Sequence, residues 1–116
     1  MAKRPTKLQM LAQTGSPEET CQATESMCSD FLDYLRSECH LAANTIDAYG
    51  RDMKRFTAHV GDRKLNQLSI SDLSDYIASL SSEGLAPASI ARNVVATRTF
   101  FKYLQLEGIV ESNPAE

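Results

Sequence analysis

The residues between positions 46 and 60 space their apolar side chains so that they fall on one face of a helix. These side chains recur every three or four residues, which is the period of a single stripe along an α-helix. The opposite face carries small, polar or basic residues at steps of four, three and four. A helix is therefore predicted from about residue 43 to residue 60, with one face in a core and the other in solvent. The stripe consists of Ile46, Tyr49, Met53, Phe56 and Val60, and the opposite face of Asn44, Ala48, Arg51 and Arg55.

Two further segments show the same period. The first predicted helix covers residues 25–39, and the third covers residues 70–82. Ser69 and Asp72 resemble a capping box at the start of the third helix, and Gly84 follows its end. We expect the buried face of the first helix to consist of Cys28, Phe31, Leu32, Leu35 and Cys39, and that of the third of Leu73, Tyr76, Ile77 and Leu80.

The fourth predicted helix covers residues 87–107, and Pro87 is well placed as its first residue. Its sequence also follows the helical period, so one face is expected to be buried and the other exposed. The predicted inner stripe is Ile90, Val94, Phe101 and Leu104, with Phe100 on the flank, and the predicted outer face carries Arg92, Val95, Thr99 and Lys102.

Length and composition are sufficient for one helical domain. The chain has 116 residues, of which 42% are hydrophobic, and it has no Trp and few Gly or Pro. Residues 1–24 are polar and without a sustained period, so a disordered tail is expected there. Residues 25–112 would form the helical domain, and residues 113–116 would start a linker. No apolar run approaches the roughly 18 residues that span a bilayer, and no secretory signal is visible, so a cytoplasmic protein is expected.

The charges are unevenly distributed among the predicted helices. Residues 25–39 hold four acids and one base, and residues 70–83 hold three acids and no base. Residues 44–60 hold three bases and two acids, and residues 87–107 hold three bases and one acid. The formal net charge of −3 argues against a nucleic-acid partner, but a cationic side formed by the second and fourth helices would attract a polyanion. The other interpretation is that neighbouring helices form compensating ion pairs, which contribute little when exposed.

The cysteines and histidines suggest no cofactor. The three cysteines, Cys21, Cys28 and Cys39, are an odd number without a close C-x-x-C pair. This pattern argues against a disulfide framework and against zinc, so we expect no metal and no other cofactor. His40 and His59 have no acid–base partner at a recognisable spacing and are expected near helix ends at the surface.

Two blocks of sequence carry a resemblance to a known family. The chain is similar, over roughly residues 26–116, to the N-terminal core-binding domain of tyrosine recombinases, the phage-integrase and Xer-type group. The order and spacing of the two blocks are more specific than either block alone. The first is Leu41-Ala42-x-Asn44-Thr45-Ile46-x-Ala48-Tyr49-x-Arg51-Asp52-Met53-x-x-Phe56. The second is Gly84-Leu85-Ala86-x-x-Ser89-Ile90-x-Arg92, continuing through Ala96-x-Arg98-x-Phe100-Phe101-x-Tyr103-Leu104 to Gly108 and Asn113-Pro114.

The resemblance implies a small orthogonal bundle of four to five helices, often called SAM-like, that forms one half of a clamp around duplex DNA. The implied partners are double-stranded DNA and other recombinase protomers, without a membrane. The catalytic domain of the family, with its nucleophilic Tyr, normally follows the Asn-Pro segment, where this chain stops. We therefore expect the chain to bind DNA without cutting it. Its own tyrosines would be core or rim aromatics, namely Tyr34, Tyr49, Tyr76 and Tyr103.

The candidate DNA-binding residues lie on the two basic helices, and most are expected to contact phosphates rather than bases. Arg98 sits at the edge of the predicted buried stripe, and it either contacts DNA or pairs with an acid of a neighbouring helix. The candidates are Asn44, Thr45, Arg51, Lys54 and Arg55 on the second helix, and Ser89, Arg92, Thr99 and Lys102 on the fourth.

A second function from another class is also compatible with the sequence. A SAM-like helical module could bind proteins through an apolar or mixed-charge patch, and the basic face would then be incidental. Substitutions distinguish the two hypotheses. If Arg51 and Arg92 are exposed DNA contacts, replacing either by Ala is expected to weaken DNA binding while changing stability by no more than about 0.5 kcal/mol.

Overall fold

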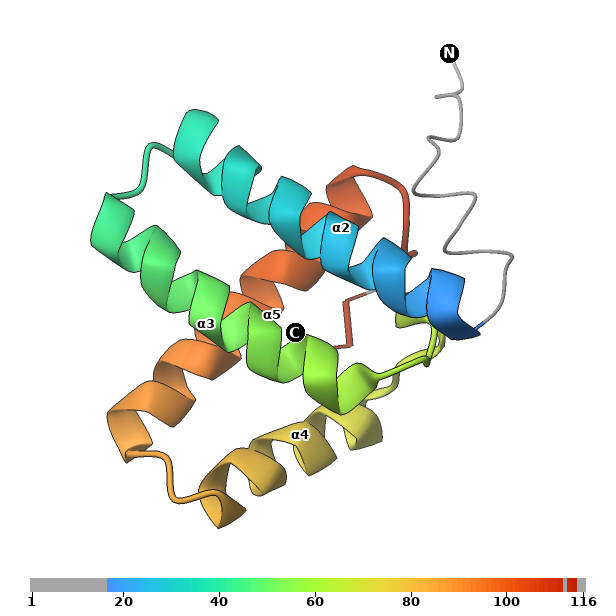
Figure 1. Ribbon diagram of the computed structural model, residues 1–116, viewed down its shortest axis with the longest axis vertical. Helices are drawn as coiled ribbons and strands as arrows, with labels where there is room; N and C mark the ends of the chain where they lie inside the picture. The colour runs from blue at the N-terminus through green and yellow to red at the C-terminus, as the bar shows by residue number, and fades with distance from the viewer. Residues whose placement is uncertain (1–16, 112, 115–116) are drawn as a thin grey trace.

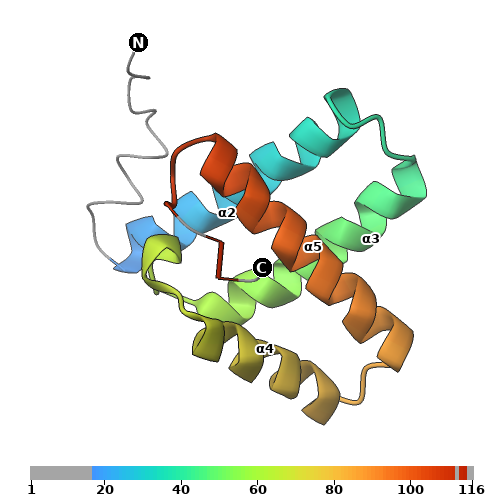
Figure 2. The same ribbon diagram turned by 180° about the vertical axis from the view of Figure 1, so that it is seen from behind.

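The computed structural model describes residues 17–111 and 113–114, and this part of the chain consists of helices without a strand. Its elements are α2 (Pro17–Ser37), α3 (Ala43–Val60), the short 3-10 helix η1 (Leu65–Gln67), α4 (Ile70–Ser82) and α5 (Pro87–Leu106). Helices α2 and α3 lie side by side and run in opposite directions, and α5 crosses behind both of them (Figure 1). Seen from behind, α5 is in front and α4 lies beside it (Figure 2). The prediction of an all-α fold is confirmed.

The bounds of three helices agree with the sequence prediction because their end signals are local. Helices α3 and α4 have the predicted bounds, and α5 ends one residue earlier than predicted, at Leu106. The capping box of α4 is present: the Asp72 N–H donates to Oγ of Ser69 (3.3 Å), and the Ser69 N–H donates to the Asp72 carboxylate (2.8 Å). These paired bonds satisfy donors that the start of a helix leaves without an intrahelical acceptor.

Helix α2 begins at Pro17, eight residues earlier than predicted. Residues 17–24 are therefore helical and do not belong to the predicted disordered tail, while the first 16 residues lie outside the described part of the chain. Thr20 and Thr24 are buried, together with Ala23 and Met27. The Thr24 hydroxyl donates to the carbonyl oxygen of Thr20 (3.0 Å), so its burial leaves no hydroxyl unsatisfied. The sequence prediction treated these threonines as polar residues of a tail and therefore missed the part of the buried face that they form.

The other end of α2 also differs from the prediction. The helix ends at Ser37, so Cys39 is exposed beyond it instead of lying on the buried face. The next residue, His40, has a φ of 52°, a left-handed conformation that a helix cannot continue through. The buried face of α2 ends at Leu35.

The core is built around Phe56 of α3, which contacts aromatic rings of two other helices. Its ring centroid lies 5.5 Å from that of Tyr76 on α4 and 5.9 Å from those of both Phe100 and Phe101 on α5. Phe100 is fully buried, although the sequence placed it on the flank, whereas Ile90 and Val94 of the predicted stripe are only half-buried. The buried face of α5 is thus rotated toward Asn93, Ala96, Thr97, Phe100, Phe101 and Leu104.

Candidate nucleic-acid interface

The two basic helices begin on the same side of the molecule, at separate heights. The first turns of α3 and α5 both lie on the left in Figure 1 and on the right in the view from behind (Figure 2). Neither helix has a side-chain cap or an acid in its first turn, in contrast to α4. The first N–H groups of each helix have no intrahelical acceptor, and the helix dipole adds partial positive charge there. The start of each of these two helices therefore suits an anion.

The outer face of α3 displays a row of polar and basic residues. Asn44, Arg51, Lys54 and Arg55 are exposed, and Thr45 is half-buried. Arg51 and Lys54 form no ion pair with any residue that the structure describes. The prediction that this face is exposed is therefore confirmed, and the opposite face, with Ile46, Met53, Phe56 and Val60, is buried.

One cation of this face has an acidic partner on another helix. Nη1 of Arg55 lies 3.1 Å from Oε2 of Glu83, the residue that caps the C-terminal end of α4. The two side chains are 47% and 56% exposed. Such an exposed pair contributes little to folding, and its cation can exchange partners.

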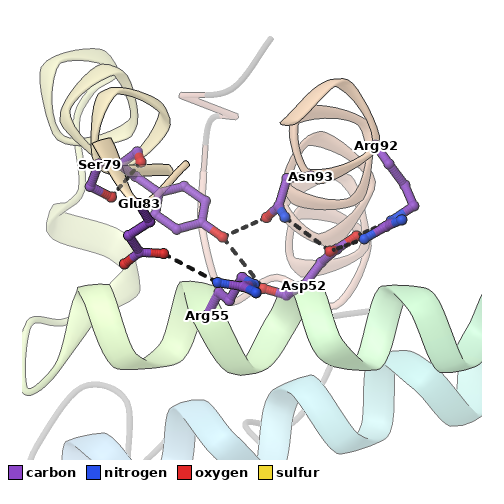
Figure 3. A network of polar contacts seen from close by, with 7 residues as sticks. Asp52, Arg55, Ser79, Glu83, Arg92 and Asn93 are labelled. Atoms are coloured by element: carbon purple, nitrogen blue, oxygen red, sulfur yellow. Dashed lines mark hydrogen bonds and ion pairs between the residues drawn. The ribbon is translucent and has the colours of Figure 1, made fainter. Parts of the chain in front are cut away.

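Arg92 forms a different kind of pair, with Asp52 of α3. Nε and Nη2 of Arg92 donate to the two carboxylate oxygens of Asp52, both at 2.8 Å (Figure 3). The Asp52 side chain is 1% exposed and that of Arg92 is 37% exposed. The hydrogen bond from this guanidinium to Asp52 raises the pKa of Arg92 above its ordinary value. The buried carboxylate is therefore neutralised by a bidentate partner that still reaches the surface.

The ion pair continues into a network that joins three helices. Nδ2 of Asn93 donates to Oδ1 of Asp52 (2.9 Å), and the Tyr76 hydroxyl donates to Oδ1 of Asn93 (2.5 Å). Burial, reinforced by the Asp52 charge, raises the pKa of Tyr76, so this hydroxyl keeps its proton and remains a donor. Helices α3, α4 and α5 are thus connected through satisfied buried polar groups.

This network corrects the prediction for Arg92. The sequence placed Arg92 on the outer face of α5 as a free cation, opposite the buried stripe. In the structure, two N–H groups of Arg92 point inward and donate to Asp52. Without them, the Asp52 carboxylate would be a buried charge without a partner. Arg92 therefore has a structural partner, and its replacement by Ala is no longer expected to leave stability nearly unchanged.

The remaining candidates on α5 are spread along the helix. Ser89 is half-buried near the start, and the Thr99 hydroxyl donates to the carbonyl oxygen of Val95 (2.7 Å). Lys102 is exposed, and it lies ten residues after Arg92, or about 15 Å along the axis. Arg98 is exposed, and its carbonyl oxygen accepts a hydrogen bond from Nδ2 of Asn113 (3.3 Å).

The sequence prediction missed two residues of this network, the acid Asp52 and the amide Asn93. Asn93 falls three residues after Ile90 and seven before Phe100, which places it on the apolar side of α5. A polar residue on a buried stripe predicts a hydrogen-bond partner elsewhere, and this signal could have pointed to a buried network. The identity of the partner, Asp52, depends on how α3 and α5 cross.

The described residues offer no recognisable metal site and no membrane span. No group of three or more His, Cys, Asp or Glu side chains in them could hold a metal ion. None of the helices there is both long enough and apolar enough to cross a bilayer. Of the tyrosines, Tyr76 is buried, and Tyr34, Tyr49 and Tyr103 are half-buried.

A groove of about 570 Å³ lies between α2 and α3. Cys28, Met53 and Thr57 are its buried residues, and the charged residues Glu25 and Lys54 also belong to its lining. Burial raises the pKa of Cys28 to about 11, an effect that a hydrogen bond with Thr57 partly offsets. Most of the lining is apolar or small.

Comparison with known proteins gives consistent matches. The family profile described as phage integrase, N-terminal SAM-like domain, matches residues 28–108. Tyrosine recombinase XerD of Listeria monocytogenes is 37% identical over 92 residues, covering 76% of this chain and 31% of the relative. Tyrosine recombinase XerC of Alcanivorax borkumensis is 35% identical, covering 73% of this chain and 28% of the relative. A tyrosine recombinase of Thermosipho africanus is 30% identical, covering 78% and 32%. The chain thus spans about a third of the length of these relatives, and no solved structure gives a significant match.

Proposed function

Because the chain belongs to the phage integrase N-terminal SAM-like domain family, we propose that it is the DNA-binding module of a site-specific tyrosine recombinase. The module binds the phosphate backbone of duplex DNA with α3 and the adjoining part of α5. It contributes to DNA integration or recombination by holding one side of the duplex, and other recombinase protomers are its partners in the assembly. A role on cellular DNA is consistent with the predicted cytoplasmic location.

The observation that supports this proposal is that two cationic features face the same side of the bundle. The uncapped N-termini of α3 and α5 both begin on that side, at separate heights (Figures 1 and 2), and the outer face of α3 adds Arg51, Lys54 and Arg55. Asn44 and Thr45 in the first turn of α3, and Ser89 in that of α5, add hydrogen-bonding side chains beside the free N–H groups. Together these groups can set the register of a phosphate backbone without reading bases. Thr99 and Lys102 extend the contact along α5.

Catalysis belongs to another part of a full-length recombinase in this proposal. The four tyrosines of this chain are buried or half-buried in the bundle. Burial raises the pKa of Tyr103 to about 12, so its hydroxyl stays protonated at neutral pH. A nucleophilic hydroxyl needs an adjacent base and access to substrate. We infer that the chain alone binds DNA without cleaving it.

Titration of a fluorescent duplex with the protein at two salt concentrations tests the proposal. Binding should be weak, on the order of 10⁻⁴ to 10⁻⁶ M at physiological salt, and should weaken as salt rises. Arg51→Ala should bind more weakly than the parent on every sequence, because a phosphate contact carries no sequence information. The proposal would be contradicted if the protein did not bind the duplex at low salt, or if its affinity did not change with salt concentration.

A protein-interaction module remains the second candidate because of the groove between α2 and α3. The groove is apolar enough to accept a partner helix. In that case Arg51→Ala would leave DNA binding unchanged, and substitutions at the groove, such as Gly50→Leu, would abolish association with a protein partner. A Cβ added at Gly50 contacts only the side chain of Leu32, at 3.6 Å, which is an ordinary van der Waals distance. Gly50 also belongs to the lining of the groove, so a substitution there introduces a side chain at this surface.

A further inference from the structure

The Arg92 guanidinium uses only one of its edges to hold Asp52. Nε and one N–H of Nη2 face the carboxylate, which leaves three of the five guanidinium N–H groups for another acceptor. These outer N–H groups make no hydrogen bond with any residue in the described part of the chain. The side chain is 37% exposed, so its outer edge reaches solvent. A planar, fixed edge of N–H donors suits a phosphate.

The residues one turn before the pair have small side chains. Ala48 lies one helical turn before Asp52 on α3, and Ala88 and Ser89 lie one turn before Arg92 on α5. A larger side chain, Tyr49, lies close enough to contribute, after Asp52, to the raised pKa of Arg92. Arg92 and Asp52 lie where α5 contacts α3 (Figure 3).

We infer that Arg92 and Asp52 together form a preassembled single-phosphate site, in which Asp52 is the positioning residue and the outer edge of Arg92 is the contact. The inference rests on the proposed DNA-binding function and assigns a specific role within it. The site differs from the contact made by Arg51, because the Arg92 charge is already neutralised by Asp52 and its side chain is already ordered.

This difference has a measurable consequence. A free cation that binds a phosphate releases counterions, so each such contact adds about 0.9 to the slope of log K against log salt. A neutral Arg–Asp pair that donates hydrogen bonds to a phosphate adds affinity with almost no change in slope. Removing the pair should therefore lower the affinity equally at every salt concentration. Removing Arg51 should instead reduce the slope of log K against log salt.

The test is a charge-neutral double substitution, Arg92→Gln with Asp52→Asn. The two amides can bond each other, so no charge is left buried. The expected result is about tenfold weaker binding to a short DNA duplex at all salt concentrations, with the slope of the parent protein, since hydrogen bonds to charged groups are worth about one factor of ten or more. Arg51→Gln, measured in parallel, should flatten the slope by about 0.9.

A matched control removes another Arg–Asp pair that lies away from this surface. Asp33 and Arg36 form an exposed pair on α2 (3.0 Å), so Asp33→Asn with Arg36→Gln changes the same residue types without a net charge change. This control should bind DNA like the parent. Arg92→Lys, which keeps the charge and leaves Asp52 paired, provides a second variant if the double substitution does not fold, and it too should bind about tenfold more weakly with an unchanged slope.

The outcomes separate this inference from the proposed function. If the parent binds DNA with a steep salt slope but the folded double variant and Arg92→Lys bind equally well, Arg92 is not a contact and the inference is overturned. A double variant whose slope flattens like that of Arg51→Gln shows that Arg92 acts as a free cation and overturns the role of Asp52. A parent that does not bind DNA overturns the proposed function itself.

Discussion

Arg55 on α3 and Glu83 at the C-terminal end of α4 form an exposed ion pair, 3.1 Å long, on the surface that we propose to face DNA. If this surface binds DNA as proposed, Glu83 competes with phosphate for Arg55. A carboxylate at the C-terminal end of a helix also opposes the helix dipole. Under that proposal the pair weakens DNA binding, and it adds little to folding.

Glu83→Gln should strengthen DNA binding several-fold and steepen the salt slope by about 0.9, because Arg55 then behaves as a free cation. Stability should change by less than about 0.5 kcal/mol. Fluorescence anisotropy with a duplex, together with urea denaturation, measures both. Asp33→Asn is the matched control, because it releases Arg36 on α2 with the same change in net charge. Equal effects of the two substitutions would mean that net charge alone, and not the position of Arg55, controls binding.

Arg92→Ala should cost about 2–4 kcal/mol of unfolding free energy, because the buried Asp52 carboxylate loses its bidentate partner. The cost stays below that of a fully buried pair because Arg92 itself is partly exposed. Urea denaturation measures this loss. Adding Asp52→Ala to Arg92→Ala should recover part of it, because no unpaired charge then remains buried. A single variant as stable as the parent would show that the pair does not form in solution.

Phe101→Ala should destabilise the domain by about 3–5 kcal/mol through a cavity beside Phe56. DNA affinity per folded molecule should remain that of the parent, because the Phe101 side chain is fully buried. Thermal unfolding followed by circular dichroism gives the stability. A change below about 1 kcal/mol would indicate that the core is packed differently from the structure.

Cys28 should make stability fall at alkaline pH. Burial raises its pKa from 9.0 to about 11, so the folded state holds a proton that the unfolded state releases first. The stabilisation is complete below about pH 9 and is lost as the pH rises through 11. Comparing unfolding free energies of the parent and Cys28→Ala between pH 8 and pH 11 isolates this effect, because all other titrating groups are common to both proteins. Parallel pH profiles for the two proteins would contradict the burial of Cys28.

Local signals predicted most of the fold. The bounds of α3 and α4 followed from periodicity and end residues such as Gly61 and Ser69, since helix ends depend on neighbouring residues in the sequence. The start of α2 was missed because its buried face includes two threonines, and the Thr24 hydroxyl is satisfied within the helix by its bond to the Thr20 carbonyl oxygen. Such residues look polar in the sequence and behave as core residues in the fold.

The exposed part of the candidate interface was also predictable, whereas its ion pairs were not. The exposure of Arg51 and Lys54 follows from the helical period alone. The partners of Arg92 and Arg55 are 40 and 28 residues away in sequence, and they depend on the crossing of α5 over α3 and on where α4 ends. Charge counting correctly marked α3 and α5 as basic, but it could not show that one arginine neutralises a buried acid.

The salt dependence of DNA binding by the parent protein tests the proposed function most directly. Three exposed cations on the two basic helices, Arg51, Lys54 and Lys102, have no acidic partner in the part of the chain that the structure describes. Three phosphate contacts predict that log K falls against log salt with a slope near −2.7. A slope near that value, flattened to about −1.8 by Arg51→Gln, is the expected result. A slope near zero, or one that Arg51→Gln leaves unchanged, would contradict a phosphate-binding surface on α3.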